Sequence, residues 1–204
     1  MISPGLSLSE PLATEAAGRG LPVVGDIELF AREARAPVAA ITGTNGKSTV
    51  TALLADVANA AHRPAIAGGN LGEPALDLLE RPVPALYVLE LSSFQLETTY
   101  SLETSTAAVL NVTPDHMDRY DSVADYAAAK ARIFDGCAVA VINADDPLVR
   151  GMLRAGQRVI SFGLADADAD YALAELPEPA LTCRGEALLP VSAMRLQGMH
   201  NVAN

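Results

Sequence analysis

The sequence predicts an α/β fold in which a parallel sheet with flanking helices carries a phosphate-binding loop. Three observations support this prediction. Short apolar runs typical of buried strands alternate with segments that have the period of amphipathic helices. A glycine-rich stretch, residues 43–49, lies between such a strand and such a helix, which is the context that a phosphate loop requires. Half of the 204 residues are hydrophobic and 19% are charged, as in globular proteins.

The predicted elements follow one another in a regular order. We expect a helix at 9–19, a short strand at 21–24, and a second helix at 26–34 with Asp26 as its N-cap. The buried strands are then "VAAIT" (38–42), "PAIAG" (64–68), "ALYVLEL" (85–91), "AAVLNV" (107–112), "AVAVIN" (138–143) and "RVISFG" (158–163). Further helices are expected after the first of these strands, with apolar residues at 50, 53, 54, 57, 58 and 61, at 123–134, and after Asp146-Pro147. From about residue 165 the pattern changes to acidic loops and short strands.

Composition excludes several classes of protein. The net charge of −11 argues against a nucleic-acid surface, although helix N-termini and bound metal ions can still hold phosphates locally. The apolar runs are far too short to span a bilayer, and no secretory signal is visible at the N-terminus. Cys137 and Cys183 lie far apart and form no metal or redox motif. We therefore expect a cytoplasmic protein in a reducing compartment.

The glycine-rich stretch Gly43–Thr49 is the first candidate site. Its glycines would let backbone N–H groups approach phosphates, and the following helix would add a favourable dipole. Lys47 would reach the outer phosphates, and the hydroxyl of Ser48 would bind Mg²⁺. The usual motif places its first glycine where this chain has Ile41, so the leading glycine is displaced to Gly43. The alternative is a glycine-rich turn that happens to contain a lysine.

Polar residues at the ends of neighbouring strands form the second group of candidates. Ligands of parallel sheets bind beyond the carboxyl ends of the strands, and Glu90 lies near that end of an otherwise apolar strand. Its carboxylate would suit Mg²⁺, or it could simply face solvent. In "GGNLG" (68–72), the paired glycines and Asn70 would suit a close approach of backbone to a ligand, with an ordinary turn as the alternative.

The segment "NVTPDHMDRY" (111–120) follows another buried strand and should reach the same edge of the sheet. Asp115, His116 and Asp118 are its candidate metal ligands or acid–base groups. A single histidine in a loop is often structural, and this alternative stays open from the sequence alone.

Lys130 is the most informative single residue. It lies on the apolar side of the 123–134 helix, seven residues after Val123 and three before Ile133. Either its stem packs while the ammonium reaches water, or burial lowers its pKa and leaves a reactive neutral amine. Such an amine can combine with CO₂ to give a carbamate, which is a new carboxylate able to hold a metal.

Taken together, these motifs resemble the Mur ligase family, and most closely its D-glutamate-adding branch. The stretches that carry the resemblance are "SPGLSLSEP" (3–11), "LPVVGDIELF" (21–30), "TGTNGKST" (42–49), "LELSSFQLE" (89–97), "NVTPDHMDRY", "AAAKARIF" (127–134), "NADDP" (143–147) and "GMHN" (198–201). "TGTNGKST" has the displaced glycine that this family uses, and the "SSFQLE" stretch is the part that points to D-glutamate addition.

The resemblance implies roles for individual residues. The ATP phosphates would be held by Gly43, Thr44, Asn45, Gly46, Lys47, Ser48 and Thr49. Ser48 and Glu90 would serve one Mg²⁺, and His116 with carbamylated Lys130 a second. The UDP-sugar substrate would face Asn70, His116, Ser3 and Gly5. Lys47, His116 and Lys130 would be the catalytic residues of an ADP-forming amide synthesis.

The resemblance also implies a domain organisation. Residues 1–36 would be the tail of an N-terminal UDP-substrate-binding domain with its linker, and 37–204 a central ATP-binding domain that lacks its last helices. The expected partners are UDP-N-acetylmuramoyl-L-alanine, D-glutamate and ATP, in a bacterial protein whose full-length form is monomeric. We expect this chain to be a fragment that is inactive alone. The alternatives are another amide ligase, of the folylpolyglutamate synthase type, a P-loop kinase, and a non-catalytic nucleotide-binding module.

Overall fold

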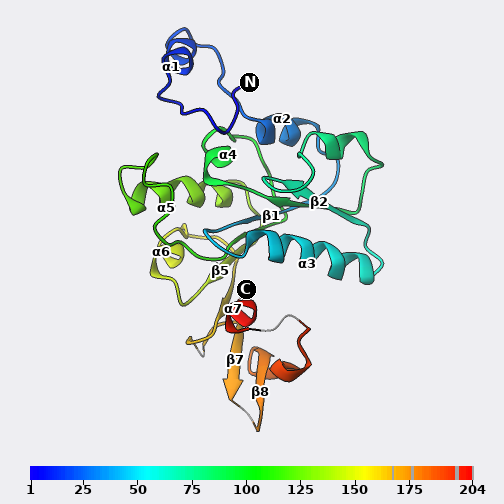
Figure 1. Ribbon diagram of the computed structural model, residues 1–204. Coiled ribbons are helices and arrows are strands. Elements are labelled where there is room, and N and C mark those ends of the chain that lie inside the picture. The colour runs from blue at the N-terminus through cyan, green and yellow to red at the C-terminus, as the bar shows by residue number, and fades with distance from the viewer. Residues whose placement is uncertain (167, 176, 196–197, 204) are drawn as a thin grey trace.

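The computed structural model describes residues 1–166, 168–175, 177–195 and 198–203, and within them the strands form one mixed sheet (Figure 1). The strands are β1 (Val38–Thr42), β2 (Ala65–Gly69), β3 (Leu86–Glu90), β4 (Thr106–Val109), β5 (Ala140–Asn143), β6 (Val159–Gly163), β7 (Tyr171–Glu175), β8 (Pro179–Cys183) and β9 (Glu186–Pro190). Their order is β2-β3-β1-β4-β5-β6-β7-β8-β9, parallel up to β7 and antiparallel from β7 to β9. The predicted α/β fold with a largely parallel sheet is therefore confirmed.

Helices connect the strands. The α-helices are α1 (Pro11–Gly18), α2 (Asp26–Glu33), α3 (Lys47–Ala60), α4 (Ser93–Glu97), α5 (Val123–Ala131), α6 (Pro147–Arg150) and α7 (Met199–Ala203). Short 3₁₀ turns are η1 (Asp77–Glu80), η2 (Arg132–Phe134) and η3 (Val191–Ala193). The predicted helix 123–134 is thus α5 followed by η2, and Asp146 caps α6 with Pro147 at its first position as predicted. In the part of the chain described, no helix is long and apolar enough to cross a membrane.

Two hydrophobic cores lie on opposite faces of the sheet. The larger core packs α2, α4, α5 and α6 against one face, through residues such as Phe30, Leu96 and Tyr126. The smaller core lies under α3 and includes Ile41, Ala55 and Val88. Successive residues of a strand point to opposite faces, so β1 and β3 contribute side chains to both cores.

Two details of the predicted N-terminal segment are wrong. Residues 21–24 form no strand, because they have no neighbouring strand to pair with; Val24 accepts one hydrogen bond from the Ile2 N–H group (2.8 Å), and Pro22 has no N–H to donate. The N-cap of α2 is Gly25 and not Asp26. Asp26 is the first helical residue, and its carboxylate accepts a hydrogen bond from the Gln95 side chain (2.9 Å).

The apolar stripe of α3 is only partly buried. Val50 and Leu54 pack against the smaller core, whereas Leu53 and Val57 are 46% and 56% exposed. The residues of α3 that are fully buried are small, namely Thr51, Ala55 and Ala58. Small residues let α3 lie close to strands that are themselves rich in alanine and glycine. This is why hydrophobic periodicity alone misplaces part of the buried face.

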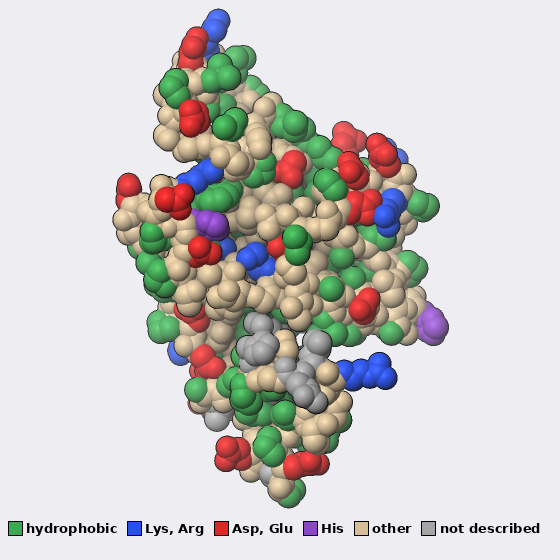
Figure 2. Space-filling view, viewed as in Figure 1, with side chains coloured by type: hydrophobic (Ala, Val, Ile, Leu, Met, Phe, Trp, Pro, Cys, Tyr) green, Lys and Arg blue, Asp and Glu red, His purple; other side chains and the backbone are tan. Residues whose placement is uncertain are grey.

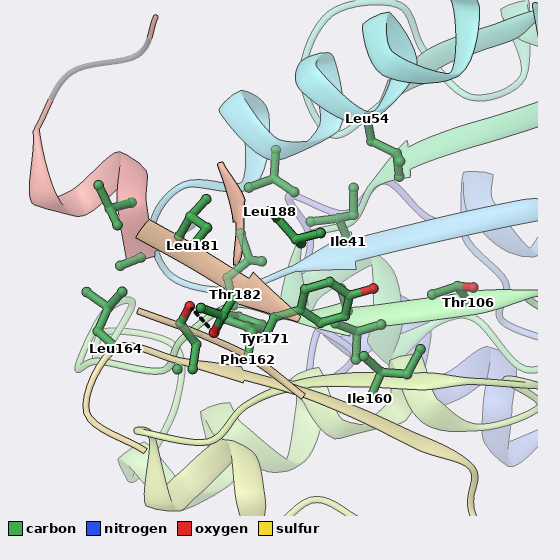
Figure 3. A pocket seen from close by; sticks show the side chains of 18 of the residues that line it. Ile41, Leu54, Thr106, Ile160, Phe162, Leu164, Tyr171, Leu181, Thr182 and Leu188 are labelled. Atoms are coloured by element: carbon green, nitrogen blue, oxygen red, sulfur yellow. Dashed lines mark hydrogen bonds between the residues drawn. The ribbon is translucent and has the colours of Figure 1, made fainter. Parts of the chain in front are cut away.

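An apolar cavity of about 620 Å³ lies on the α3 side of the sheet, between α3 and the hairpin strands (Figure 3). Ile41, Leu54, Ile160, Phe162 and Leu188 are among the side chains that line it. None of the residues predicted to bind phosphate, metal or substrate lines this cavity. The candidate site is therefore a different feature of the molecule, at the carboxyl edge of the sheet.

The two glycines at the end of β2, Gly68 and Gly69, are required because other backbone segments of the protein pass too close for a side chain. A Cβ atom on Gly69 would lie 2.3 Å from the carbonyl oxygen of Glu90, and its φ is +114°. A Cβ atom on Gly68 would lie 2.3 Å from the carbonyl oxygen of Glu73. The close approach expected from "GGNLG" is thus an approach to the protein's own backbone.

Gly69→Ala is expected to destabilise the fold by about 2–4 kcal/mol, because it combines a backbone clash with a disfavoured φ. Gly72→Ala is the matched control: its φ is +81°, but nothing lies within 4 Å of the added Cβ atom. The control should cost only about 1–2 kcal/mol. Urea unfolding followed by circular dichroism measures both, and equal losses would contradict the steric argument.

Candidate functional site

The glycine-rich loop joins β1 to α3 at the carboxyl edge of the sheet. Gly46 has a φ of +83° and is the N-cap of α3, so Lys47, Ser48 and Thr49 form the first turn of that helix. The ammonium of Lys47 donates a hydrogen bond to the carbonyl oxygen of Thr44 (3.0 Å). The N–H groups in the first turn of a helix lack partners within the helix and, with the helix dipole, favour an anion, so the start of α3 can hold phosphate.

The displaced glycine has a structural reason. Ile41 lies within β1, is only 2% exposed, and packs in the smaller core, so a glycine there would remove a core side chain. The close approach of backbone occurs two residues later instead. A Cβ atom on Gly43 would lie 3.1 Å from Leu110 Cβ and 3.3 Å from the Asn111 nitrogen, with a φ of +153°.

Asn111, at the end of β4, holds the loop from one side. Its side-chain oxygen accepts hydrogen bonds from the N–H groups of Thr44 (3.1 Å) and Asn45 (2.9 Å), and its side-chain nitrogen donates to the Asn45 carbonyl oxygen (3.1 Å). The Thr44 hydroxyl donates to the Thr113 carbonyl oxygen (3.2 Å) and accepts from the Thr113 N–H group (3.0 Å). Sequence reasoning did not single out Asn111, which lies inside the predicted strand 107–112, whereas β4 ends at Val109.

Glu90 and Asn70 lie next to each other at the carboxyl edge of the sheet. Glu90 pairs with Ile41 of β1 and with Gly69 of β2, so it lies directly beside the start of the phosphate loop. Its side chain is 2% exposed, and its Oε1 atom accepts a hydrogen bond from the Asn70 amide (2.9 Å). Among the described residues, no salt bridge neutralises this carboxylate.

The surroundings of Glu90 therefore fit a cation. A buried carboxylate is costly unless it is paired with a positive charge, and a hydrogen bond from a neutral amide supplies none. Oxygen donors of this kind are those that Mg²⁺ prefers. The exposed hydroxyl of Ser48, in the first turn of α3, is a second oxygen donor at the same sheet edge.

The loop after β4 brings His116 to this edge but not as part of a ready metal cluster. His116 has a φ of +54°, and its ring lies 4.9 Å from the ring of Phe94. Its Nε2 atom is 3.7 Å from the carboxylate of Asp115. Within the described residues, no three His, Cys, Asp or Glu side chains are grouped as metal ligands, so Asp115, His116 and Asp118 do not form such a site together.

Lys130 is buried under the phosphate loop. Its side chain is 1% exposed, and Nζ donates hydrogen bonds to the carbonyl oxygen of Gly43 (2.9 Å) and the hydroxyl of Thr42 (3.4 Å). Nζ also lies 4.5 Å from the ring centre of Tyr126. The alternative in which the ammonium reaches water is wrong. The pKa of Lys130 is lowered to about 7, chiefly by burial and also by the charge of Lys47, while Asp115 opposes both.

The N-terminal loop also reaches this region. Ser3 and Gly5 are exposed and close a small turn, with the Gly5 N–H group donating to the Ser3 hydroxyl (3.4 Å). Arg119, three residues after His116, donates to the carbonyl oxygens of Pro4 and Leu6, both at 3.0 Å. Ser3 and Gly5 are thereby held beside the loop that carries His116.

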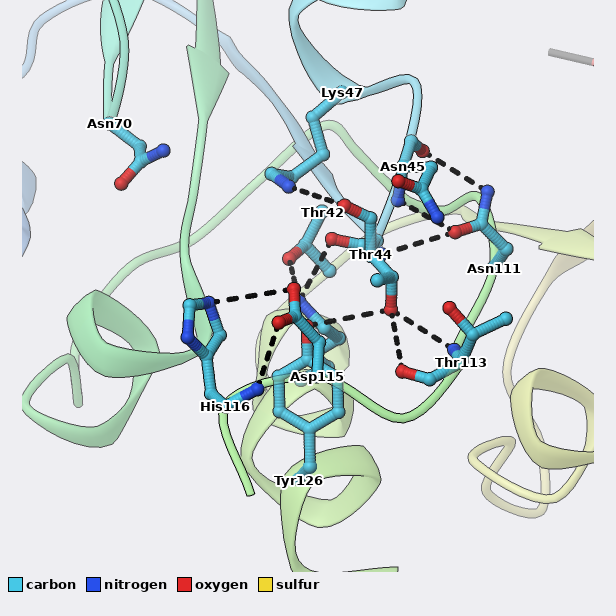
Figure 4. A network of polar contacts seen from close by, with 12 residues as sticks. Thr42, Thr44, Asn45, Lys47, Asn70, Asn111, Thr113, Asp115, His116 and Tyr126 are labelled. Atoms are coloured by element: carbon cyan, nitrogen blue, oxygen red, sulfur yellow. Dashed lines mark hydrogen bonds and ion pairs between the residues drawn. The ribbon is translucent and has the colours of Figure 1, made fainter. Parts of the chain in front are cut away.

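The assembled site combines elements that are far apart in the sequence. Figure 4 shows Asp115, His116 and Tyr126 on one side of the phosphate loop and Asn111 and Thr113 on the other. Figure 2 shows purple histidine and blue basic side chains close together on one face of the molecule, among acidic ones, although the net charge is −11. The phosphate loop, a buried carboxylate and a buried amine are therefore collected at one edge of the sheet.

Comparison with known proteins identifies the family of this chain. Residues 41–204 match the Mur ligase middle domain. The chain belongs to the Mur ligase family. It is 53% identical over 206 residues to UDP-N-acetylmuramoylalanine--D-glutamate ligase of Nitrosococcus oceani and 54% identical over 204 residues to that of Alcanivorax borkumensis, covering 100% of this chain in both cases. It covers 46% and 45% of these two proteins, so the chain spans about half of their length.

Solved structures of Mur ligases have the same fold. A UDP-N-acetylmuramoyl-L-alanyl-D-glutamate--2,6-diaminopimelate ligase superposes with a TM-score of 0.70 at 26% identity, covering 82% of this chain and 41% of that one. UDP-N-acetylmuramate-alanine ligase of Thermotoga maritima superposes with a TM-score of 0.64 at 22% identity, covering 98% and 47%. These Mur ligase structures match the sheet and helices of this chain.

Asn111→Ala is expected to weaken ATP binding roughly 10- to 100-fold, because the Asn45 N–H and carbonyl groups lose their partner and the Thr44 N–H group keeps only the backbone carbonyl oxygen of residue 111 (3.0 Å). Asn59→Ala is the matched control. The Asn59 side chain also bridges backbone groups, donating to the Ala65 carbonyl oxygen (3.0 Å) and accepting from the Ala65 N–H group (2.9 Å). It lies near the C-terminal end of α3, at the opposite end of that helix from the phosphate loop. Calorimetric titration with ATP and Mg²⁺ measures the effect. Equal weakening in both variants would show that Asn111 acts only through general stability.

Proposed function

We propose that this chain is the ATP-binding half of a D-glutamate ligase that acts in peptidoglycan precursor synthesis. The complete enzyme would join D-glutamate to UDP-N-acetylmuramoyl-L-alanine and release ADP and phosphate. The observation that carries the proposal is the convergence of the phosphate loop, Glu90 and the Lys130 amine at one sheet edge. The match of the whole chain to D-glutamate ligases supports the choice of amino acid.

The proposed reaction has two steps. The carboxylate of the L-alanyl group attacks the γ-phosphorus of ATP, the bond to the β-phosphate oxygen breaks, and an acyl phosphate and ADP form. The neutral amine of D-glutamate then attacks the acyl carbon, phosphate leaves, and the nitrogen loses a proton to give the amide. In the first step, the loop N–H groups and Lys47 would hold the phosphates and stabilise the charge that develops on them.

Metal ions would add to this charge stabilisation. Mg²⁺ supplies charge neutralisation on phosphate oxygens when it is bound. We propose that Ser48 and Glu90 hold one ion, and that His116 with a carbamate on Lys130 holds the other. Formation of the carbamate needs the neutral amine, which forms a bond from Nζ to the carbon of CO₂ and loses a proton. A pKa of about 7 makes this form abundant near neutral pH.

The remaining predicted residues would contact the UDP-sugar substrate. Asn70 and His116 would face it from the central domain, and Ser3 and Gly5 from the N-terminal loop. This assignment goes with a domain boundary near residue 36, between the tail of a UDP-substrate domain and the central ATP-binding domain.

A chimera tests the proposal, with residues 1–204 replacing the aligned part of the Nitrosococcus oceani relative. We expect phosphate release that requires ATP, UDP-N-acetylmuramoyl-L-alanine and D-glutamate together. Hydroxylamine should trap the acyl phosphate as a hydroxamate when D-glutamate is omitted. A stable phosphorylated product without hydroxamate would favour a kinase, and preference for another amino acid would overturn the assignment of D-glutamate.

A further inference from the structure

Arg119 connects three separate parts of the chain. Its side chain is 14% exposed, and its guanidinium donates from Nη1 to the Pro4 carbonyl oxygen and from Nη2 to the Leu6 carbonyl oxygen, both at 3.0 Å. The same Nη2 atom pairs with the carboxylate of Glu97 at the end of α4 (3.2 Å). One planar cation thus fixes the N-terminal loop and α4 relative to the loop after β4.

The loop of residues 3–6 has few other attachments. Its own turn is closed by the Leu6 N–H group, which donates to the Ser3 carbonyl oxygen (3.0 Å). Of the hydrogen bonds seen in the described ranges, those that tie residues 3–6 to another segment all come from Arg119. Ser3 and Gly5 are therefore positioned by this side chain, together with the hydrogen bond from the neighbouring Ile2 N–H group to the Val24 carbonyl oxygen (2.8 Å).

Arg119 also supports His116. The guanidinium carbon lies 4.1 Å from the ring centre of Phe94, whose ring centre is 4.9 Å from that of His116. The backbone N–H group of Arg119 donates to the His116 carbonyl oxygen (2.9 Å), which closes the turn where His116 has a φ of +54°. Phe94 therefore contacts both side chains, with its ring tilted by 53° to that of His116.

We propose that Arg119 is a positioning residue that holds the Ser3–Leu6 loop and the His116 ring in one arrangement for the UDP-sugar substrate. This inference rests on the proposed function, because that function gives the two loops a common ligand. Lysine is a poor substitute. Its three donors all lie on one atom, whereas the guanidinium spreads its donors over separate nitrogens that reach Pro4, Leu6 and Glu97 while its central carbon lies near the Phe94 ring.

Steady-state kinetics of the chimera test this role. We expect Arg119→Gln to raise the KM for UDP-N-acetylmuramoyl-L-alanine roughly 10- to 100-fold, because both loops lose their common anchor. The KM for ATP should stay within about threefold, since the phosphate loop is held by Asn111 and not by Arg119. Arg119→Lys should give an intermediate KM for the UDP substrate.

Arg132 provides a matched control. Its Nε and Nη2 atoms donate to the carbonyl oxygens of Leu96 and Thr99, both at 2.8 Å, and its guanidinium carbon lies 5.4 Å from the Tyr100 ring centre. It therefore has the same kinds of contact without touching residues 3–6. Arg132→Gln should lower stability while leaving the ratio of the two KM values within about threefold. An equal change of this ratio in both variants would overturn the proposal.

Hydrogen exchange of the 204-residue chain provides a readout without any turnover. Peptides covering residues 2–8 should exchange faster in Arg119→Gln than in Arg132→Gln or in the unchanged chain. Unchanged exchange in Arg119→Gln would overturn the proposal. If the unsubstituted chimera needs no D-glutamate for phosphate release, the proposed function fails, and the exchange experiment still decides whether Arg119 fastens the loop.

Discussion

Replacing Lys130 with alanine is expected to abolish turnover by the chimera, with a loss of at least about a thousandfold. The Lys130 Nζ atom donates to the carbonyl oxygen of Gly43, the first residue of the phosphate loop, from a fully buried position. If its role is to carry a carbamate, bicarbonate should partly rescue Lys130→Ala, because the small anion can occupy the space left by the side chain. Full activity in the variant would remove Lys130 from the mechanism.

The buried Lys130 should also lower the free energy of unfolding when its amine is protonated. Lowering the pKa from 10.5 to about 7 corresponds to a cost of about 5 kcal/mol for the ammonium in the folded state. The unfolded chain binds more protons at this site than the folded chain between pH 7 and about 10, so stability should rise as the pH rises through that window. The full cost applies below pH 7, where both states are charged.

Lys130→Met tests this linkage, because it keeps an apolar stem and removes the charge. Between pH 7 and pH 9, the free energy of unfolding should rise about 2 kcal/mol more in the unchanged chain than in Lys130→Met. Urea unfolding at the two pH values measures the difference, and the comparison with the variant removes the contribution of other titrating groups. If the stability of both proteins changed with pH in the same way, the pKa of Lys130 would not be lowered by folding.

The lysine content of the chain makes the carbamate directly observable. Lys47 and Lys130 are its two lysines. With ¹³C-labelled bicarbonate, a carbamate signal that persists in Lys47→Arg and disappears in Lys130→Met would be assigned to Lys130. A signal lost only in Lys47→Arg would place the modification on the wrong residue for the proposed role.

The fold was predictable wherever a strand was strongly apolar and its connections were short. β1, β3 and β4 were predicted from continuous apolar runs, and the alternation of strands and helices was sufficient to predict a parallel sheet. The predictions are wrong where tertiary contacts decide the secondary structure or which residues are buried. Residues 21–24 have strand composition but no partner strand, and α3 buries alanines because glycine- and alanine-rich strands allow close packing.

The candidate site was predictable where a residue type is unusual for its position. Glu90 in an apolar strand and Lys130 on an apolar helix face were singled out for that reason, and both are buried, which decides against the solvent-facing alternatives left open by the sequence. Asn111 and Arg119 lie in the segment 111–120 but were not singled out, because a single asparagine or arginine there gives no sign of the partners it bonds. Their importance lies in the partners they bond, which are up to 115 residues away in the sequence.

Lys47→Met is expected to reduce turnover of the chimera by about a thousandfold, because the loop loses the charge that neutralises the transferring phosphoryl group. Stability should change by less than about 1 kcal/mol, since within the described residues the ammonium makes a single hydrogen bond, to Thr44, at a partly exposed position. Lys47→Arg keeps the charge and serves as the control. Turnover of Lys47→Met close to that of the unchanged chimera would contradict the assignment of the phosphate loop.

Lys47→Met should also raise the pKa of Lys130. Two cations near one loop disfavour each other, and Lys47 is one of the causes that lower the Lys130 pKa to about 7. Because the variant contains a single lysine, the ¹³Cε chemical shift of that residue reports its titration directly. A pKa above that of Lys130 in Lys47→Arg would show that the phosphate-loop charge keeps Lys130 neutral. This would couple carbamate formation to the occupancy of the loop, because bound phosphate compensates the charge of Lys47. An unchanged pKa would show that Lys47 does not affect the pKa of Lys130, so that burial alone lowers it.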